Sequence, residues 1–234
     1  MRDEMHWPHT HGTLCEMFNT CVDWLYEEWA EHLVHELCVD AILPKCPEFA
    51  EHVVAKGGVG SLTNVWGFID GTIREISRLT EGQREVYNGW KRLHGLKYQS
   101  ITTPDGILRE CWGPMLARRH DAHMLYESGL LDVLDDNFND AANKRPWALY
   151  GDPAYPETPW LMVGFRVRHE AAFNKRMNKC RVSVEWRFRK VIANWAYADF
   201  VKKQKLLECP TGSARQLASR SCAIDQLSHL LLWV

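Results

Sequence analysis

The stretch VWGFIDGT, residues 65–72, joins a run of apolar residues directly to an acidic residue and a glycine. The apolar residues from Val65 to Ile69 predict a buried strand, because short apolar runs bounded by glycines are typical of interior strands. A carboxylate at the end of such a strand is held rigidly beside the core, which suits a metal ligand or a catalytic base. Asp70 with Gly71 also matches the opening of an ordinary turn. The stretch alone leaves both roles for Asp70 open.

Two further β-like segments follow this strand and predict a hairpin. They span Leu96–Thr102 and Ile107–Trp112, and the residues between them are Thr103-Pro104-Asp105-Gly106. Proline fixes φ and glycine permits unusual φ values, so this tetrapeptide predicts a tight turn. The hairpin therefore comes after the Asp70 strand in chain order.

Two helices are predicted later in the chain. Leucines at helical spacing follow His120-Asp121, and Asp121 is suitably placed to be the N-cap of that helix. The pattern from Ala171 to Ala198 predicts a long closing helix, in which Glu185 lies beside the apolar stripe. We expect the inward face of this closing helix to carry Val182, Trp186, Val191 and Trp195.

A second apolar strand, Trp147–Tyr150, runs into Gly151-Asp152 and repeats the arrangement at Asp70. Strand, hairpin, helix, strand and closing helix is the order of an RNase H-like core, in which the first and fourth strands lie side by side. Asp70, Asp152 and Glu185 would then converge without a basic partner and repel one another unless a cation lay among them. Mg²⁺ and Mn²⁺ prefer such oxygen ligands, and two such ions can hydrolyse a phosphodiester. The sequence therefore predicts an α/β protein with an RNase H-like mixed sheet, flanked by helices.

The composition is that of an ordinary globular protein, with 46% hydrophobic and 25% charged residues. No apolar run approaches the roughly 20 residues that a membrane-spanning helix needs, and the N-terminus does not match a signal peptide, so we expect an intracellular protein without membrane contact. The eight cysteines are dispersed and form no C-x-x-C pair, which argues against a zinc ribbon or a disulfide framework.

Charge is distributed unevenly along the chain. Between Arg166 and Lys190 there are nine Arg and Lys residues against two acidic residues, whereas residues 1–54 are strongly acidic. Such a basic segment indicates nucleic-acid contact, although a solvated helix face explains it equally well. His6, His9 and His11 lie close together, but without a second cluster a solvated N-terminus explains them better than a metal site.

Two helices are predicted before the first strand. Apolar residues spaced by three or four from Leu14 to Leu37 predict a long amphipathic helix, and Pro47–Lys56 predicts a short one with proline in its first turn. We therefore expect an N-terminal helical segment over residues 1–56, a nuclease-like domain over residues 57–200 and a C-terminal tail over residues 201–234.

Five motifs in this order resemble the PIF/Harbinger-type transposases, which are DDE superfamily endonucleases, and the resemblance spans Leu14 to Trp195. Each motif is unspecific alone, whereas five in the right order are specific. They are GFIDGT at 67–72, YNGWKRLHGLKYQSITTPDG at 87–106, GP followed by RRHD within 113–121, LYGDPAYP at 149–156, and AFNKRMNKCRVSVEWRF at 172–188.

The resemblance implies a divalent-metal-dependent endonuclease that hydrolyses DNA phosphodiester bonds, with Mg²⁺ or Mn²⁺ as cofactor. By motif, Asp70, Asp152 and Glu185 would be the catalytic triad, and Asp121 would join them as a metal ligand rather than a helix cap. The family resemblance also implies a nuclear protein with DNA as its partner, and it allows for a separate DNA-binding partner protein.

A catalytically silent DNA-binding or partner-binding protein that retains the fold is the alternative. Only the last helix of the family's N-terminal DNA-binding region is recognised here, and Arg189 stands where the family commonly has glycine. A zinc hydrolase built on the scattered histidines is less consistent with the sequence, because no H-x-x-x-H pair is flanked by a catalytic acid. The intact acidic residues favour the endonuclease.

Overall fold

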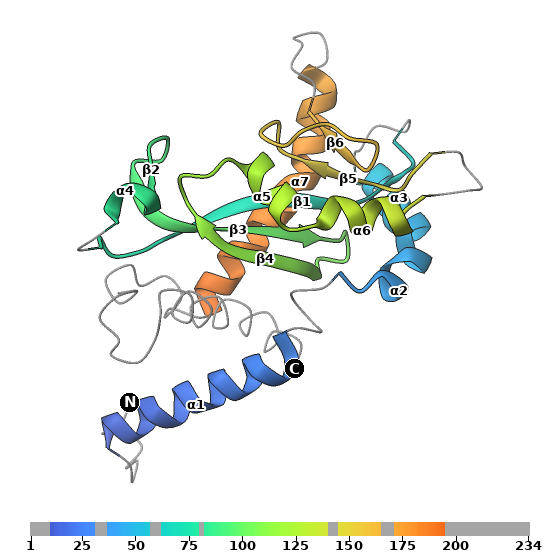
Figure 1. Ribbon diagram of the computed structural model, residues 1–234. Coiled ribbons are helices and arrows are strands. Elements are labelled where there is room, and N and C mark those ends of the chain that lie inside the picture. The colour runs from blue at the N-terminus through green and yellow to red at the C-terminus, as the bar shows by residue number, and fades with distance from the viewer. Residues whose placement is uncertain are drawn as a thin grey trace.

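A six-stranded mixed sheet with helices on both faces forms the centre of the protein (Figure 1). The computed structural model describes residues 10–30, 37–56, 62–79, 82–139, 145–164 and 171–194, and beyond residue 182 it describes only the backbone. The elements in chain order are α1 (His11–Ala30), α2 (Val39–Ile42), the 3-10 helix η2 (Leu43–Lys45), α3 (Cys46–Ala55), β1 (Val65–Glu75), α4 (Gln83–Val86), β2 (Tyr87–Asn88), β3 (Leu93–Thr102), β4 (Leu108–Leu116), α5 (Asp121–Glu127), α6 (Leu130–Asn137), β5 (Ala148–Gly151), β6 (Leu161–Val163) and α7 (Ala171–Asn194).

The strand order confirms the predicted RNase H-like fold. Strand β1 lies in the middle of the sheet, antiparallel to β3 on one side and parallel to β5 on the other. Strand β6 continues the parallel side, while β2 and β4 both pair with β3. Strands β1 and β5 are therefore neighbours, as the order of the sequence elements predicted.

Side chains alternate along β1 between two helical layers, because successive residues of a strand point to opposite faces. Ile69 packs with Leu125 and Leu134 of the α5–α6 layer. Phe68 packs with Met177 and Cys180 of α7 on the other face. Figure 1 shows α5 and α6 on one side of the sheet and α7 crossing the other.

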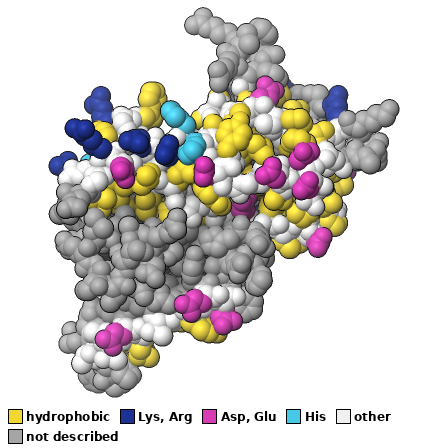
Figure 2. All heavy atoms as spheres, viewed as in Figure 1, with side chains coloured by type: hydrophobic (Ala, Val, Ile, Leu, Met, Phe, Trp, Pro, Cys, Tyr) yellow, Lys and Arg dark blue, Asp and Glu magenta, His cyan; other side chains and the backbone are white. Residues whose placement is uncertain are grey.

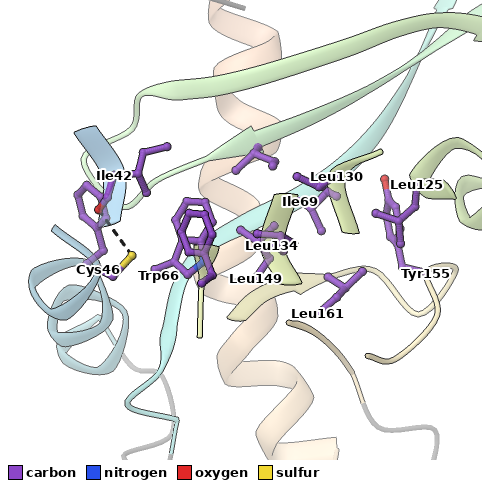
Figure 3. Close-up of a cluster of buried hydrophobic side chains, with 13 residues drawn as sticks. Ile42, Cys46, Trp66, Ile69, Leu125, Leu130, Leu134, Leu149, Tyr155 and Leu161 are labelled. Atoms are coloured by element: carbon purple, nitrogen blue, oxygen red, sulfur yellow. Dashed lines mark hydrogen bonds between the residues drawn. The ribbon is translucent and has the colours of Figure 1, made fainter. Parts of the chain in front are cut away.

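The larger core cluster lies between the sheet and α6. The ring of Trp66 stacks on that of Phe138, with their centroids 5.0 Å apart. Figure 3 shows Trp66, Leu134 and Leu149 within this cluster, each of them fully buried. Helices α2 and α3 close the cluster through apolar residues such as Ile42 and Phe49. This packing fixes β1 and β5 between the helices.

The hairpin turn and the short N-terminal helix are confirmed. The amide of Gly106 donates to the carbonyl of Thr103 at 2.8 Å, and Gly106 has a φ of 81°. Pro47 lies in the first turn of α3, as predicted from the sequence. Helix α1 confirms a helix from His11 to Ala30, whereas His6, His9 and the tail over residues 201–234 lie outside the described residues. None of the described helices is long and apolar enough to cross a membrane.

Three local expectations are wrong. His120 is the N-cap of α5 and Asp121 is its first residue, without a side-chain capping bond. The predicted helix after Asp121 is two helices, because Gly129 adopts a left-handed conformation at their junction. Val182 is 36% exposed, so the described inward face of α7 is formed by Met177 and Cys180 instead.

Glu110 is a buried carboxyl in β4. Its side chain is 4% exposed, and its Oε2 has no hydrogen-bond partner among the described residues. Burial disfavours the ionised form and raises the pKa of Glu110 from 4.5 to about 8, so the carboxyl is neutral in the folded protein at neutral pH.

The raised pKa of Glu110 predicts a loss of stability with increasing pH. Because the folded state holds this proton more tightly than the unfolded state, the stabilisation is fully present below pH 4.5 and is lost as pH rises through about 8. Urea denaturation at pH 5 and pH 8 should show a larger loss of unfolding free energy for wild type than for Glu110→Gln. Equal losses in the two proteins would contradict the assignment.

Candidate active site

The parallel register between β1 and β5 places Asp70 beside Asp152. Phe68 is the register partner of Tyr150 in this pair of strands. Asp70 and Asp152 each come two residues later, so both lie at the same level and on the same face of the sheet. Asp152 follows the end of β5, whereas β1 continues past Asp70 to Glu75, so the expectation that the first strand ends at Asp70 is wrong. Neighbouring strands lie about 4.8 Å apart, which is close enough for two carboxylates to share one cation. This is the side-by-side placement that the sequence predicted for these two residues.

A tight turn holds Asp152 at the end of β5. Its Oδ1 accepts a hydrogen bond from the amide of Ala154 at 2.8 Å, and its carbonyl accepts one from the amide of Tyr155 at 3.0 Å. Asx turns of this kind fix a carboxylate relative to its own backbone. Asp152 remains partly exposed, so its carboxylate is fixed in position but open to solvent.

Asp121 approaches β1 from the opposite face. A Cβ atom added to Gly71 would lie 2.8 Å from Oδ1 of Asp121, so a larger residue at position 71 would force this carboxylate to move. Because Gly71 and Asp70 are successive residues of one strand, their side-chain directions are opposite. Asp121 therefore lies on the α5 side of β1, whereas Asp70 faces α7.

Tyr155 is a buried phenol close to the three carboxylates. Its side chain is 3% exposed, and its hydroxyl has no hydrogen-bond partner among the described residues. Burial raises the pKa of Tyr155 well above its usual value, and the negative charges of Asp121, Asp70 and Asp152 raise it further. Asp121, Asp70 and Asp152 therefore all lie near Tyr155, although Asp121 and Asp70 are on opposite faces of β1.

These carboxylates line a cleft of about 1060 Å³. The cleft is bordered by residues 70–73 of β1 and by the residues that follow β5. Five basic side chains line the same cleft, against three carboxylates. The charged lining residues are Asp70, Lys91, Lys97, Arg118, Arg119, Asp121, Asp152 and Arg181.

Two of these basic side chains are bound to the carboxylates, so the expectation of acids without a basic partner is wrong. Nη1 of Arg181 lies 3.1 Å from Oδ1 of Asp70, and both side chains are 15% exposed. Nζ of Lys97 lies 2.8 Å from Oδ1 of Asp121 and also donates to the carbonyl of Arg119 at 2.8 Å. The two cations offset the repulsion that would otherwise separate the carboxylates.

Glu185 lies on α7, four residues after Arg181, and its side chain is outside the described part of the structure. Its predicted role stays a prediction. Sequence patterns did not identify Lys97 or Tyr155 as parts of this site, and they placed Arg181 within reach of Glu185 rather than of Asp70. A lysine in a strand segment without another Lys, Arg, Asp or Glu, LHGLKYQSIT of β3, was the one available signal, because a lysine inside a sheet needs a charged partner.

The described residues contain no group of three His, Cys, Asp or Glu side chains that could hold a metal ion. The placement of Asp121 on the opposite face of β1 and the two ion pairs explain this result. The carboxylates that lie together with matching register are Asp70 and Asp152, and their oxygen atoms are the ligand type that Mg²⁺ and Mn²⁺ prefer. This pair fits a divalent cation chemically, provided that Arg181 leaves Asp70.

A mixed sheet of this order has Asp70 in the middle of β1 and Asp152 directly after the parallel neighbour β5, and it matches an RNase H-like nuclease fold. The family described as DDE superfamily endonuclease matches residues 69–224, about two thirds of the chain. The chain therefore belongs to this family. No curated protein and no solved structure matches the chain.

The extent of the family match differs from the predicted extent of the resemblance. The match begins within β1, whereas the resemblance was expected to begin at Leu14. It also continues to residue 224, beyond Trp195, where the resemblance was expected to end. Helix α1 is therefore outside the matched region, and the segment after α7 is largely inside it.

Replacing Lys97 by methionine should destabilise the protein. The change keeps an aliphatic side chain but leaves Asp121 and the carbonyl of Arg119 without their partner, which costs about 3 kcal/mol for a largely buried pair. Lys91→Met removes an exposed lysine from the same cleft and should change the free energy of unfolding by less than about 0.5 kcal/mol. Chemical denaturation measures both, and equal values for the two variants would contradict a structural role for the Lys97–Asp121 pair.

Proposed function

We propose that this chain is a divalent-metal-dependent endonuclease that hydrolyses DNA phosphodiester bonds in the manner of a transposase. The observation that carries the proposal is the register of β1 and β5, which sets Asp70 beside Asp152 in a cleft with an excess of basic side chains. Membership of the DDE superfamily endonucleases supports the same class of reaction. The basic side chains suit a polyanionic substrate, because phosphate contacts dominate affinity for DNA.

Asp70 and Asp152 are the proposed metal ligands, with Glu185 of α7 as the third member of the triad. Divalent ions bound there would activate the attacking water and stabilise the leaving oxygen of the phosphodiester. Asp121 is the fourth predicted ligand, and Lys97 would have to release it before it could bind a metal. We therefore assign the first metal position to Asp70 and Asp152.

The remaining charged residues of the cleft divide into two roles. Arg181 neutralises Asp70 in this structure. A metal ion held by Asp70 would supply that positive charge instead, and the guanidinium of Arg181 would then be available to a DNA phosphate beside the carboxylates. Lys91, Arg118 and Arg119 are exposed, and none of them has an ion-pair partner among the described residues. These three hold the phosphates of the strand that enters the cleft.

The proposal also covers the type of transposase, the cellular location and a partner protein. We assign the chain to the Harbinger-type transposases on the strength of its five motifs, and we place it in the nucleus, where DNA is available. A separate DNA-binding partner would supply recognition of specific sequence, because contacts to phosphates carry none. A silent protein that retains the fold is the outcome if no cleavage is found.

Plasmid nicking tests the proposed function. With Mg²⁺ or Mn²⁺ the purified chain should convert supercoiled plasmid to the open-circular form, and chelation of the metal should stop the reaction. Asp152→Asn and Glu185→Gln should each abolish nicking while leaving DNA binding within about twofold, because they remove predicted metal ligands rather than phosphate contacts. Equal nicking by wild type and both variants, or DNA binding by wild type without nicking, would refute the endonuclease assignment.

Arg181→Gln tests the competition between the arginine and the metal for Asp70. The variant keeps a polar side chain of similar length but removes the positive charge, so Mn²⁺ should raise its melting temperature more than it raises that of wild type. Asp152→Asn should show a smaller shift than wild type. The reading is wrong if Arg181→Gln lowers the metal-induced shift, or if all three proteins shift equally.

A further inference from the structure

Trp90 is almost completely exposed, although tryptophan is among the largest apolar side chains. It is 93% exposed, the highest value among the exposed large hydrophobic residues in the described ranges. Exposed tryptophan presents a flat aromatic surface to water, and such residues are common where a protein binds a ligand. Trp90 lines the same cleft as Asp70 and Asp152.

The turn that carries Trp90 is fixed by its own hydrogen bonds. Oδ1 of Asn88 accepts from the amide of Lys91 at 2.8 Å, and Nδ2 of Asn88 donates to the carbonyl of Ala117 at 2.7 Å. The turn between β2 and β3 is thus tied to the loop before α5. Arg92 has a φ of 55°, a left-handed conformation that is uncommon for residues other than glycine. Tyr87 and His94 close the base of the turn through their rings, whose centroids are 5.1 Å apart.

This arrangement presents Trp90 on a rigid support rather than burying it. The tie to Ala117 brings the Trp90 turn next to the loop that carries Arg118 and Arg119, both of which line the cleft. Figure 2 shows Lys and Arg side chains gathered over the end of the sheet that carries β2. An aromatic face therefore lies among exposed cations, at the wall of a cleft that also holds the carboxylate pair.

An aromatic face among cations matches the two chemical parts of a nucleotide. The cations suit the phosphates, and the indole suits a base, because every base has a π-face that can stack on an aromatic side chain. Bases of an intact duplex are stacked on each other and cannot reach a protruding side chain, so the base that meets Trp90 must be unpaired or turned out of the helix. A partner protein fits less well, because the exposed side chains that share the cleft with Trp90 include Lys91, Arg118 and Arg119, which are all basic.

We infer that Trp90 is a base-stacking platform that holds an unpaired nucleotide of the DNA strand beside the carboxylate pair. The inference rests on the proposed function for its choice of DNA as ligand. It adds a substrate class, namely DNA whose strands are separated at the position to be cut. Lys91, Arg118 and Arg119 hold the adjacent phosphates, and Asn88 positions the platform.

Binding of single-stranded and duplex oligonucleotides of the same sequence, without divalent metal, tests this inference. Fluorescence anisotropy should show that Trp90→Ala weakens binding of the single strand about fivefold to a hundredfold and changes duplex binding less than twofold. Trp90→Phe should keep most of the single-strand affinity, because it retains an aromatic face. Tyr126→Ala removes another exposed aromatic, outside the residues that line the cleft, and should change neither affinity.

A second readout locates the contact on a base. An oligonucleotide with a single 2-aminopurine should lose fluorescence when wild type or Trp90→Phe binds, and should keep it when Trp90→Ala binds at saturating concentration. Equal losses of single-strand and duplex affinity in Trp90→Ala, or quenching that persists in that variant, would overturn the inference. Unchanged single-strand affinity in Trp90→Ala would also overturn the inference. This is the result expected if Trp90 contacts a partner protein rather than DNA.

The two proposals fail separately in these experiments. Stacking on Trp90 by a chain that never nicks plasmid refutes the endonuclease alone. Metal-dependent nicking by a chain whose single-strand affinity does not depend on Trp90 refutes the platform alone. Because Trp90 is exposed, its replacement should leave the melting temperature unchanged, and this check separates lost stacking from unfolding.

Discussion

The parallel register between β1 and β5 is the constraint on which the cleft depends, because it decides which side chains lie together. A shift of one residue would turn Asp152 to the opposite face of the sheet, away from Asp70. Hydrogen bonds at the start of β5 resist such a shift. Nδ2 of Asn64 donates to the carbonyl of Pro146, and the carbonyl of Asn64 accepts from the amide of Ala148, both at 2.8 Å. The buried Leu149 then anchors the strand from within the core.

Charge balance is the second constraint, and it links stability to the proposed function. Carboxylates brought together in a partly buried cleft require positive charge nearby. In this structure Arg181 and Lys97 supply this positive charge. Arg181 comes from α7 on one face of the sheet, and Lys97 comes from β3 and pairs with Asp121 on the other face. Lys97 is itself buried and tied to a carbonyl, so its pair with Asp121 behaves as part of the framework. Arg181 reaches from α7 to Asp70 in the middle of β1. A metal ion would compete with Arg181 for Asp70, and a DNA phosphate would compete with Asp70 for Arg181.

Local patterns in the sequence were sufficient for the elements that build the sheet. The apolar run before Asp70, the Thr103–Gly106 turn and the apolar run before Asp152 each correspond to observed structure, because each depends on residues close in sequence. Their order along the chain was sufficient to predict that the two acidic strands are neighbours. The family match supports the same fold independently.

Features that depend on distant contacts were not predictable in this way. Asp70 and Arg181 are 111 positions apart in the sequence, and no local pattern connects them. The local pattern at Asp121 fitted a helix cap and the family resemblance implied a metal ligand, whereas the side chain pairs with Lys97 of β3 in this structure. Periodicity placed Val182 inward, whereas among the described side chains of α7 Met177 and Cys180 pack against the sheet and Val182 is partly exposed. Trp186, Val191 and Trp195, which were also expected to face inward, lie outside the described side chains.

Iron-mediated cleavage of the polypeptide tests the central claim most directly. Fe²⁺ occupies oxygen-ligand sites of Mg²⁺, and with ascorbate and peroxide it generates radicals that cut the nearby backbone. Mass spectrometry of the fragments should locate cuts beside Asp70 and Asp152, and excess Mg²⁺ should suppress both. Cuts confined to the histidines at the N-terminus, or cuts that Mg²⁺ does not suppress, would contradict a metal site formed by the carboxylates of β1 and β5.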